Sequence, residues 1–445
     1  MTRPIAVLFL AWAAMTSPVR AGAEQSPAPD HLRLTLAETV ERARLNSPRL
    51  EQLRSLQQAA DAGLRGAKAG RLPLLDLSAF YTRNSNVPEF VVAFPGSPPA
   101  VLFPNIPNNY GAHVGLVQPL YTGGRVGGRI AAAEHGLRAA GKDVEAGTSD
   151  LVLETITAYW SLVASRENAR VLTESIASYE ANLKLTQDRF DVGMAARNDV
   201  LNIQVERDRA ELGRLQATSN AAVANVNLVR LLGLPPGSTI EPTEAVAAPA
   251  SLPEEMEGLV AQALSNRPEI AGLRARADAA EAQIRVVRSA TRPQASLNAG
   301  YDYYRPNLRI LPPVDGWNDT WNVGVSLSIR AFDGGRTSAA TAEAKAQADA
   351  ARHQLDELER QVRLEVTARA LDLSTRGAEL DVAERSLGAA RENVRVSQDR
   401  YREGLIPASE LLDAETRLLR AGLDRTTAAT TLRQARANLD RAVGR

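Results

Sequence analysis

Hydrophobic and polar residues alternate strictly in two stretches of the second half of the chain, 294–304 and 320–330. The apolar positions are Ala295, Leu297, Ala299, Tyr301 and Tyr303 in the first stretch, and Trp321, Val323, Val325, Leu327 and Ile329 in the second. A period of two over about ten residues predicts β-strands, and a tilted strand of ~9–11 residues is long enough to cross a bilayer. Two less regular stretches, 74–82 and 111–120, predict a matching pair of strands, although Gln118 interrupts the apolar face of the second.

Long proline-free segments follow each pair of predicted strands. The segments 125–190 and 336–401 contain no proline, and each predicts a single helix about 100 Å long at ~1.5 Å per residue. Apolar residues recur at heptad spacing in both: Ala169, Leu172, Ile176, Tyr179, Leu183 and Phe190 in the first, and Leu380, Ala383, Leu387, Ala390, Val394 and Tyr401 in the second. Such a narrow seam is typical of coiled helices. The shorter helices expected at about 48–68 and 199–232 can stack end to end beside the first long one.

The two halves of the chain are repeats of one another. "QDRFDVGMAARNDVLN" at 187–202 matches "QDRYREGLIPASELLD" at 398–413, at an offset of 211 residues. Nearer the front, Asn46-Ser47-Pro48 matches Asn266-Arg267-Pro268 at an offset of 220. The difference falls between Pro73 and Tyr121, where several prolines predict an irregular loop that is longer in the first half.

The repeat and its boundaries predict the domain organisation. We expect a first repeat at 24–233, a proline-rich linker at 234–255 and a second repeat at 256–445. The elements expected in the first repeat are strands at about 74–82 and 111–120, a long helix at 125–190, a tip at 191–198 and a return helix at 199–232. Those expected in the second are strands at about 294–304 and 320–330, a long helix at 336–401, a tip at 402–408 and a return helix at 409–443.

A pair of glycines lies at each junction between strand and long helix: Gly123-Gly124 and Gly334-Gly335. Glycine accepts the backbone angles that a sharp bend requires. A glycine-rich turn from strand to helix can also bind phosphate, but neither copy has the lysine and hydroxyl residue of a nucleotide-binding loop. We therefore interpret both pairs as structural bends.

Glycines also lie between each long helix and its return helix. Gly193 and Gly404 fit the left-handed position that ends a helix, and Asn198 and Ser409 are candidate N-caps of the following helices. Acidic residues come next: Asp199, Glu410 and Asp413. Carboxylates in a first helical turn stabilise the helix dipole by ~0.3–1 kcal/mol, which is sufficient to explain them without a further role.

The amino-acid composition argues against several classes of function. Aromatic residues make up only 4%, the formal net charge is zero and there is no cysteine, so we expect no nucleic-acid partner and no thiolate chemistry. The histidines lie in no metal-ligand spacing and no catalytic motif is present, so we predict neither an enzyme nor a cofactor or metal site. The histidines are His31, His113, His135 and His353.

The first residues predict export. Arg3, an apolar run at 5–14 and the small residues at 21–23 are typical of a secretory signal, which we assign to 1–23. No later apolar run approaches the ~20 residues of a membrane helix, so entry into a membrane would require the strands. Four strands are too few for a barrel, and eight leave an interior filled with side chains. Three chains would give twelve strands and an open lumen, which predicts a homotrimer in contact with membrane lipid.

The motifs "VQPLYTGGR" and "RFDVGMAARNDVL", the long coiled helices and the internal repeat together resemble the TolC-type outer-membrane efflux proteins over nearly the whole mature chain. This resemblance implies a mainly α fold with membrane β-strands, in which a trimeric twelve-stranded barrel in the outer membrane of a Gram-negative bacterium joins a periplasmic helical tunnel. It also implies docking to an inner-membrane transporter through a periplasmic adaptor, for efflux or type I secretion. The linker at 234–255 would form part of an equatorial belt.

The same resemblance assigns roles at the tips. It implies that Gly193 and Gly404 shape adaptor-docking tips, and that Asp199, Glu410 and Asp413 form acidic rings at a periplasmic gate closed by Tyr401 and an arginine. The position expected for that arginine is Ile406 in this chain; the alternatives are Arg400, Arg402 and Arg197.

Two other classes remain open from the sequence. A periplasmic coiled-coil scaffold would explain the helices but not the paired amphipathic strands. An adaptor would also be exported with a helical hairpin, but it usually has one hairpin and no membrane strands.

Overall fold

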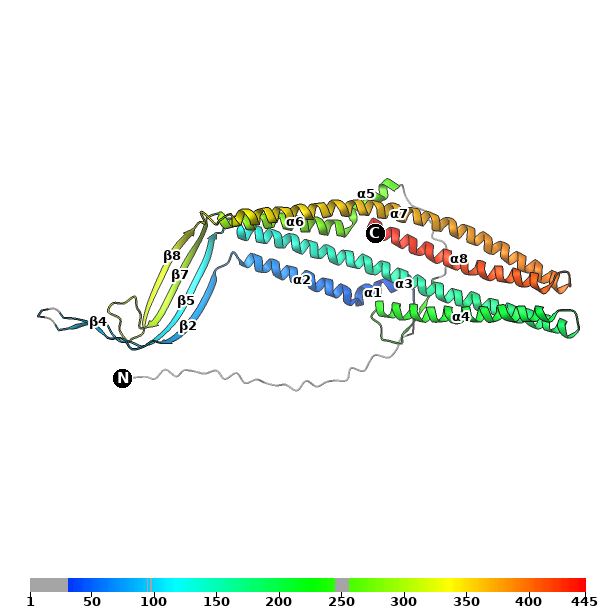
Figure 1. Cartoon of the computed structure of the whole chain (residues 1–445), viewed down its shortest axis with the longest axis horizontal. Coiled ribbons are helices and arrows are strands. Elements are labelled where there is room, and N and C mark those ends of the chain that lie inside the picture. Colours follow the sequence, from blue (N-terminus) through cyan, green and yellow to red (C-terminus); the bar gives the residue numbers. More distant parts are fainter. Residues whose placement is uncertain (1–30, 94, 97, 245–255) are drawn as a thin grey trace.

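The chain forms an elongated molecule with strands at one end and two helical hairpins at the other (Figure 1). The structure, a computed structural model, describes residues 31–93, 95–96, 98–244 and 256–445. The expected signal at 1–23 and the 245–255 part of the expected linker lie outside the described residues.

Two long helices of equal length run through the molecule, each with a return helix and a shorter helix lying end to end beside it (Figure 1). The long helices contain 67 residues each, and the 125–190 and 336–401 expected from the sequence lie within them. The helices of the first repeat are α1 (Leu36–Asn46), α2 (Pro48–Ala69), α3 (Arg125–Asp191) and α4 (Arg197–Leu231). Those of the second are α5 (Met256–Asn266), α6 (Pro268–Arg288), α7 (Arg336–Arg402) and α8 (Ala408–Val443), with a short 3₁₀ turn η1 (Ser289–Thr291) after α6.

Apolar clusters hold the helices together. One cluster in the first repeat includes the fully buried Tyr159 and Trp160 of α3, and one in the second includes Val366 of α7 and Leu432 of α8. A third, towards the tips, combines both repeats and includes Tyr401. The two repeats therefore pack against each other as one body and not as separate domains.

Four antiparallel strands form one sheet in the order β2-β5-β7-β8. They are β2 (Leu74–Arg83), β5 (Asn108–Tyr121), β7 (Gln294–Arg305) and β8 (Asn318–Ser328). The register places Leu77 opposite Val114, Val114 opposite Tyr301, and Tyr301 opposite Trp321. Because side chains alternate between the two faces of a strand, the predicted apolar residues gather on one face of the whole sheet.

The structure adds two details to the strands predicted from the sequence. The strand expected at 320–330 ends at Ser328, so Ile329 lies beyond it. Gln118, at the helical end of β5, donates a hydrogen bond from Nε2 to the carbonyl of Arg71 at 2.9 Å. Its amide is therefore satisfied by the backbone where the strand meets the helices.

Two small sheets were not predicted. The loop expected to be irregular contains an antiparallel pair, β3 (Phe90–Val92) and β4 (Ala100–Phe103), with the prolines outside the paired residues. The expected linker contains β6 (Thr239–Pro242), which pairs in parallel with β1 (His31–Leu34). Strands of four residues carry too little pattern to identify, and the partners of β1 and β6 lie far apart in sequence.

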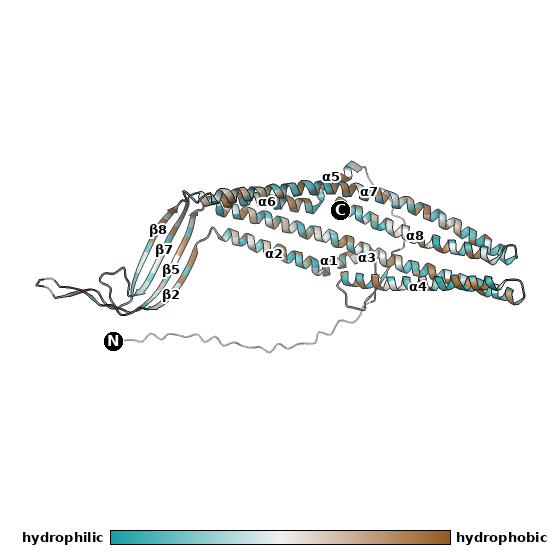
Figure 2. Cartoon of the chain, in the orientation of Figure 1, coloured by the Kyte–Doolittle hydropathy of each residue, from teal (hydrophilic) through white to brown (hydrophobic). Residues whose placement is uncertain are grey.

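The mainly helical fold with paired strands is confirmed for the single chain. Within the residues that the structure describes, no helix has an apolar stretch long enough to cross a membrane. Figure 2 shows hydrophobic and hydrophilic residues alternating along the strands and along the long helices.

Candidate functional site at the helical tips

The two tips have the same backbone hydrogen bonds. After α3, the N–H of Gly193 donates to the carbonyl of Phe190 at 2.9 Å, and that of Met194 donates to the carbonyl of Arg189 at 2.7 Å. This pair of bonds is the Schellman pattern that ends a helix, and it requires a left-handed residue. Gly193 supplies it with φ of 76°.

The second tip repeats this arrangement 211 residues later. The N–H of Gly404 donates to the carbonyl of Tyr401 at 3.0 Å, and that of Leu405 donates to the carbonyl of Arg400 at 2.9 Å. Gly404 has φ of 76°, and a Cβ at Gly193 or Gly404 would meet no atom within 4 Å. Both positions therefore select glycine for its backbone angle and not for space.

The predicted N-caps of the return helices are wrong. Helix α4 begins at Arg197 with Ala196 as its N-cap, and α8 begins at Ala408 with Pro407 as its N-cap, so Asn198 and Ser409 lie inside the first turns. At the first tip Asp199 makes the capping bond, because its Oδ2 accepts from the N–H of Ala196 at 3.2 Å. The helices begin earlier than the polar residues suggest.

Glu410 has no equivalent bond to make. It occupies the place in α8 that Asp199 has in α4, but the N-cap there is Pro407, which has no N–H to donate. Glu410 and Asp413 are both exposed, and their spacing of three residues puts them on the same side of α8. These two carboxylates are therefore free to face the surroundings of the tip.

Tyr401 joins the two tips of the chain. Its buried hydroxyl lies 2.8 Å from Oγ1 of Thr186, which belongs to α3. The guanidinium of Arg189 lies over its ring, with 4.4 Å between the guanidinium carbon and the ring centroid, and the same guanidinium donates to the carbonyl of Arg402 at 2.8 Å. Arg189 therefore ties the end of α3 to the end of α7.

Arg189 was not predicted from the sequence. The available signal was the repeated pair of an arginine and an aromatic residue, Arg189-Phe190 and Arg400-Tyr401, at the 211-residue offset. Which ring each arginine would contact could not be read from the sequence, because the contact joins residues far apart in the chain.

The residue at the position of the expected arginine belongs to the core. Ile406 is 7% exposed and packs in the cluster that contains Tyr401 and Leu411, so an arginine there would bury a charge among apolar side chains. Of the alternatives, Arg402 lies 3.9 Å from Asp399, and no hydrogen bond or ion pair within the described chain joins Arg400 or Arg197 to Tyr401, Glu410 or Asp413.

A buried carboxyl lies further along α8. Glu415 is 5% exposed, and its Oε1 accepts from Ser178 at 3.2 Å and from Asn182, both on α3. Burial raises the pKa of Glu415 above its ordinary value, although hydrogen bonds from Ser178, Gln398 and Asn182 act in the opposite direction. This residue was not singled out from the sequence.

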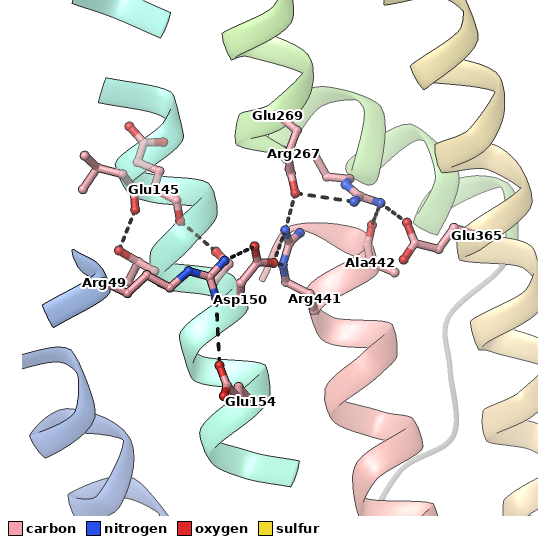
Figure 3. Close-up of polar contacts among 12 residues, drawn as sticks. Arg49, Glu145, Asp150, Glu154, Arg267, Glu269, Glu365, Arg441 and Ala442 are labelled. Carbon is pink, nitrogen blue, oxygen red and sulfur yellow. Dashed lines mark hydrogen bonds and ion pairs between the residues drawn. The ribbon is translucent and has the colours of Figure 1, made fainter. Parts of the chain in front are cut away.

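Charged side chains also join the repeats where α6 begins and α8 ends (Figure 3). Arg441 of α8 donates to Asp150 of α3 at 2.7 Å and to Glu269 of α6, and only 11% of its side chain is exposed. Beside it, Arg267 donates to Glu365 of α7 at 2.5 Å. This cluster fixes the joint between the shorter helices of the second repeat and the long helix of the first.

The glycine pairs at the strand-to-helix junctions all have positive φ, from 64° at Gly123 to 93° at Gly124. Gly124 and Gly335 are the N-cap positions of α3 and α7. Among the residues described, no group of three acidic, histidine or cysteine side chains is arranged to hold a metal ion.

Comparison with known sequences gives a match in both repeats. The profile of the family described as outer membrane efflux protein matches residues 39–234 and 259–445. Outer membrane protein TolC of Vibrio cholerae is 23% identical over 386 residues, which cover 86% of this chain and 84% of TolC. Outer membrane efflux protein BepC of Brucella suis is 25% identical over 284 residues, which cover 64% of this chain and 59% of BepC.

Solved structures agree with the fold. The outer membrane protein VceC of Vibrio cholerae superposes with a TM-score of 0.76 at 22% identity, covering 92% of this chain and 96% of VceC.

Proposed function

The chain belongs to the outer membrane efflux protein family, and from that premise we propose that three copies form one export conduit, with a twelve-stranded barrel in the membrane and a helical tunnel in the periplasm. As a member of this family it is an outer-membrane channel protein of a Gram-negative bacterium and serves efflux or secretion. The proposal further includes an inner-membrane transporter that delivers the cargo and a periplasmic adaptor that docks at the tips around Gly193 and Gly404.

The unpaired edges of the four-stranded sheet carry the trimer proposal. In a single chain, β2 and β8 each pair on one side only, which leaves a row of backbone N–H and C=O groups without partners. Such groups cost several kcal/mol each in hydrocarbon, so a spanning sheet must close on itself. Pairing β8 of one chain with β2 of the next satisfies both edges, and three chains give a lumen.

The two faces of the sheet fit this arrangement. The apolar face is exposed in the single chain, with Trp321 71% and Leu77 79% accessible. At the end away from the helices it carries an aromatic cluster in which the ring of Trp317 lies 4.8 Å from that of Tyr303, as expected for a membrane-interface belt. The opposite face is mainly polar and includes His113, whose Nδ1 lies 2.6 Å from Oδ1 of Asp302.

The assembly can be tested directly. The detergent-solubilised protein should have the mass of three chains and should conduct ions in planar bilayers. A conducting monomer or dimer would contradict the barrel proposal. A periplasmic scaffold or an adaptor would leave the outer membrane without detergent and would lack a heat-modifiable band.

The acidic residues at the tips are proposed as the periplasmic gate. In a trimer, three copies each of Glu410 and Asp413 would gather negative charge around a narrow opening and attract cations, with Tyr401 and Asp199 holding the tips beside them. The double variant Glu410→Gln with Asp413→Asn should therefore reduce the cation preference of the channel. Cation selectivity equal to that of the unmodified channel would leave these carboxylates with a helix-dipole role only.

A further inference from the structure

Of two arginines at equivalent positions in the repeats, Arg189 and Arg400, only Arg189 contacts the other tip within a single chain. Arg189 stacks on the ring of Tyr401 and donates to the carbonyl of Arg402. Its counterpart in the second repeat, 211 residues later, is Arg400. The side chain of Arg400 is exposed and makes no hydrogen bond or ion pair with any other residue described in the structure.

The two residues that Arg189 contacts, Tyr401 and Arg402, also have counterparts in the first repeat. Those of Tyr401 and Arg402 are Phe190 and Asp191 in the first repeat. Phe190 is 38% exposed although it occupies the same place in the heptad seam as the buried Tyr401. The carbonyl of Asp191 lies in the last turn of α3, where carbonyls have no intrahelical donor. The first tip thus presents an open aromatic ring beside a free acceptor.

The local geometry of the two arginines is the same. Each is the residue whose carbonyl accepts the longer-range bond of its Schellman pattern, at 2.7 Å for Arg189 and 2.9 Å for Arg400. Each is followed by an aromatic residue, and three residues after that comes a glycine with φ of 76°. Arg400 therefore occupies the same position at the end of α7 that Arg189 occupies at the end of α3.

We propose that in the trimer the Arg400 side chain of each chain stacks on Phe190 of the next chain and donates a hydrogen bond to the carbonyl of Asp191 there. This inference rests on the proposed trimer, in which first and second repeats alternate around the axis. The second repeat of one chain then faces the first repeat of the next as the two repeats face each other within a chain. The six tips are joined in a ring by six arginines.

In the proposed ring of six tips, stronger contacts within a chain alternate with weaker contacts between chains. Within a chain, the hydroxyl of Tyr401 adds a bond to Thr186 at 2.8 Å. Between chains the aromatic side chain is that of Phe190, which has no hydroxyl. The contact with Arg400 there is not reinforced by a second hydrogen bond. The joints between chains are therefore the ones that separate first when the tips part.

The absence of cysteine from the chain allows a cross-linking test. The variant with Arg400→Cys and Asp191→Cys is treated, as the detergent-solubilised full-length protein, with a short bismaleimide and run on a denaturing gel. The expected result is dimer and trimer bands, which the two single-cysteine variants should not give. The matched control, Arg189→Cys with Arg402→Cys, reproduces the observed contact and should cross-link within one chain, leaving only monomer with altered mobility.

The outcomes separate this inference from the trimer itself. The mass of the uncross-linked protein establishes whether three chains assemble. Three chains per particle, with the control pair cross-linked and no bands between chains from the Arg400 and Asp191 pair, would overturn the inference and leave the trimer intact. Failure of the control pair would also overturn it, because the contact from which it is derived would then be absent in solution.

A second measurement tests the role of the contact. Arg400→Gln should raise the conductance of the isolated channel several-fold, because the joints between chains lose their donor. Arg391→Gln alters an exposed arginine nine residues earlier on the same helix, away from the tip contacts, and should leave the conductance unchanged. Equal conductance in the Arg400→Gln and unmodified channels would mean that Arg400 does not hold the tips together.

Discussion

Glu415 occupies a place where the first repeat has an amide. The residue 211 positions earlier is Gln204, and a protonated carboxyl resembles an amide because each has both a donor and an acceptor. Burial between α8 and α3 raises the pKa of Glu415, so the folded chain holds this proton more tightly than the unfolded chain does. The bonds from Ser178 and Asn182 accordingly join the two repeats through a carboxyl that is sensitive to pH.

The sign of the pH effect follows from linkage. A raised pKa contributes stability that is fully present below the ordinary value of 4.5 and is lost as the pH rises through the folded value. We expect Glu415→Gln to remove this dependence and to stabilise the protein by about 1–2 kcal/mol at neutral pH, since a buried charge is replaced by a neutral group. Thermal unfolding of the solubilised protein between pH 4 and 8 measures it. Glu410→Gln, an exposed carboxyl on the same helix, is the control; identical pH profiles for both variants would contradict the expectation.

At the scale of elements, the two glycine junctions bend alike but are packed differently. Gly123 has φ of 64°, and a Cβ added there would lie 2.7 Å from Cβ of Arg292 and 3.1 Å from the carbonyl oxygen of Ser289. Gly334 has φ of 66°, but a Cβ there would meet nothing within 4 Å. The first junction is therefore packed against the turn η1 that follows α6, and the second is open in the single chain.

This difference predicts unequal effects of the same substitution. Gly334→Ala should cost about 1–2 kcal/mol for its left-handed backbone alone, whereas Gly123→Ala should cost more because Arg292 must also move. The amount of heat-modifiable protein in the outer-membrane fraction and its unfolding temperature are the measurements. Equal losses for the two variants would mean that the packing around Gly123 yields without cost.

The long elements were predictable from sequence because each repeats a local pattern many times. The proline-free segments predicted the long helices to within one residue of their observed ends, and the alternation predicted the clearest strands. Short elements and side-chain contacts depend on distant partners. Strands β1 and β6 pair although they lie about 200 residues apart, and the contact between Arg189 and Tyr401 joins the two repeats. No local sequence pattern specifies either contact. Asn198 and Ser409 failed as N-caps because a polar residue inside the first turn looks the same in sequence as one at its start.

At the scale of the whole molecule, one charged cluster holds the repeats together at a distance from both ends. Arg441 crosses from the second repeat to Asp150 of the first (Figure 3), while its counterpart, Arg230, donates to Glu154 at 2.9 Å within its own repeat. Burial raises the pKa of Glu269, but its hydrogen bond with Arg441 and the nearby positive charges prevail, so the pKa lies below the ordinary value.

Removing Arg441 should loosen this joint. We expect Arg441→Met to destabilise the solubilised protein by about 2–3 kcal/mol, because Glu269 is left partly buried with only the more distant Arg267, 3.5 Å away, as a cationic partner. A lowered pKa contributes stability above the ordinary value of 4.5 that is lost as the pH falls through the folded value, so the loss should be full at neutral pH and shrink in acid. Arg230→Met, at a side chain 63% exposed, should change the unfolding temperature little. An equal effect at both arginines would show that the cluster does not depend on crossing between repeats.

Helices α3 and α7 have the same length, 67 residues each. This equality limits the insertions and deletions that the two helices can accept. Deleting one heptad from α3 and its return helix would retract one tip by about 10 Å and separate Arg189 from Tyr401. The same deletion in both repeats would shorten the proposed tunnel and leave the tips level. We therefore expect insertions and deletions in the long helices to be tolerated only in matched pairs, so that the length of the proposed tunnel changes by whole heptads in both repeats.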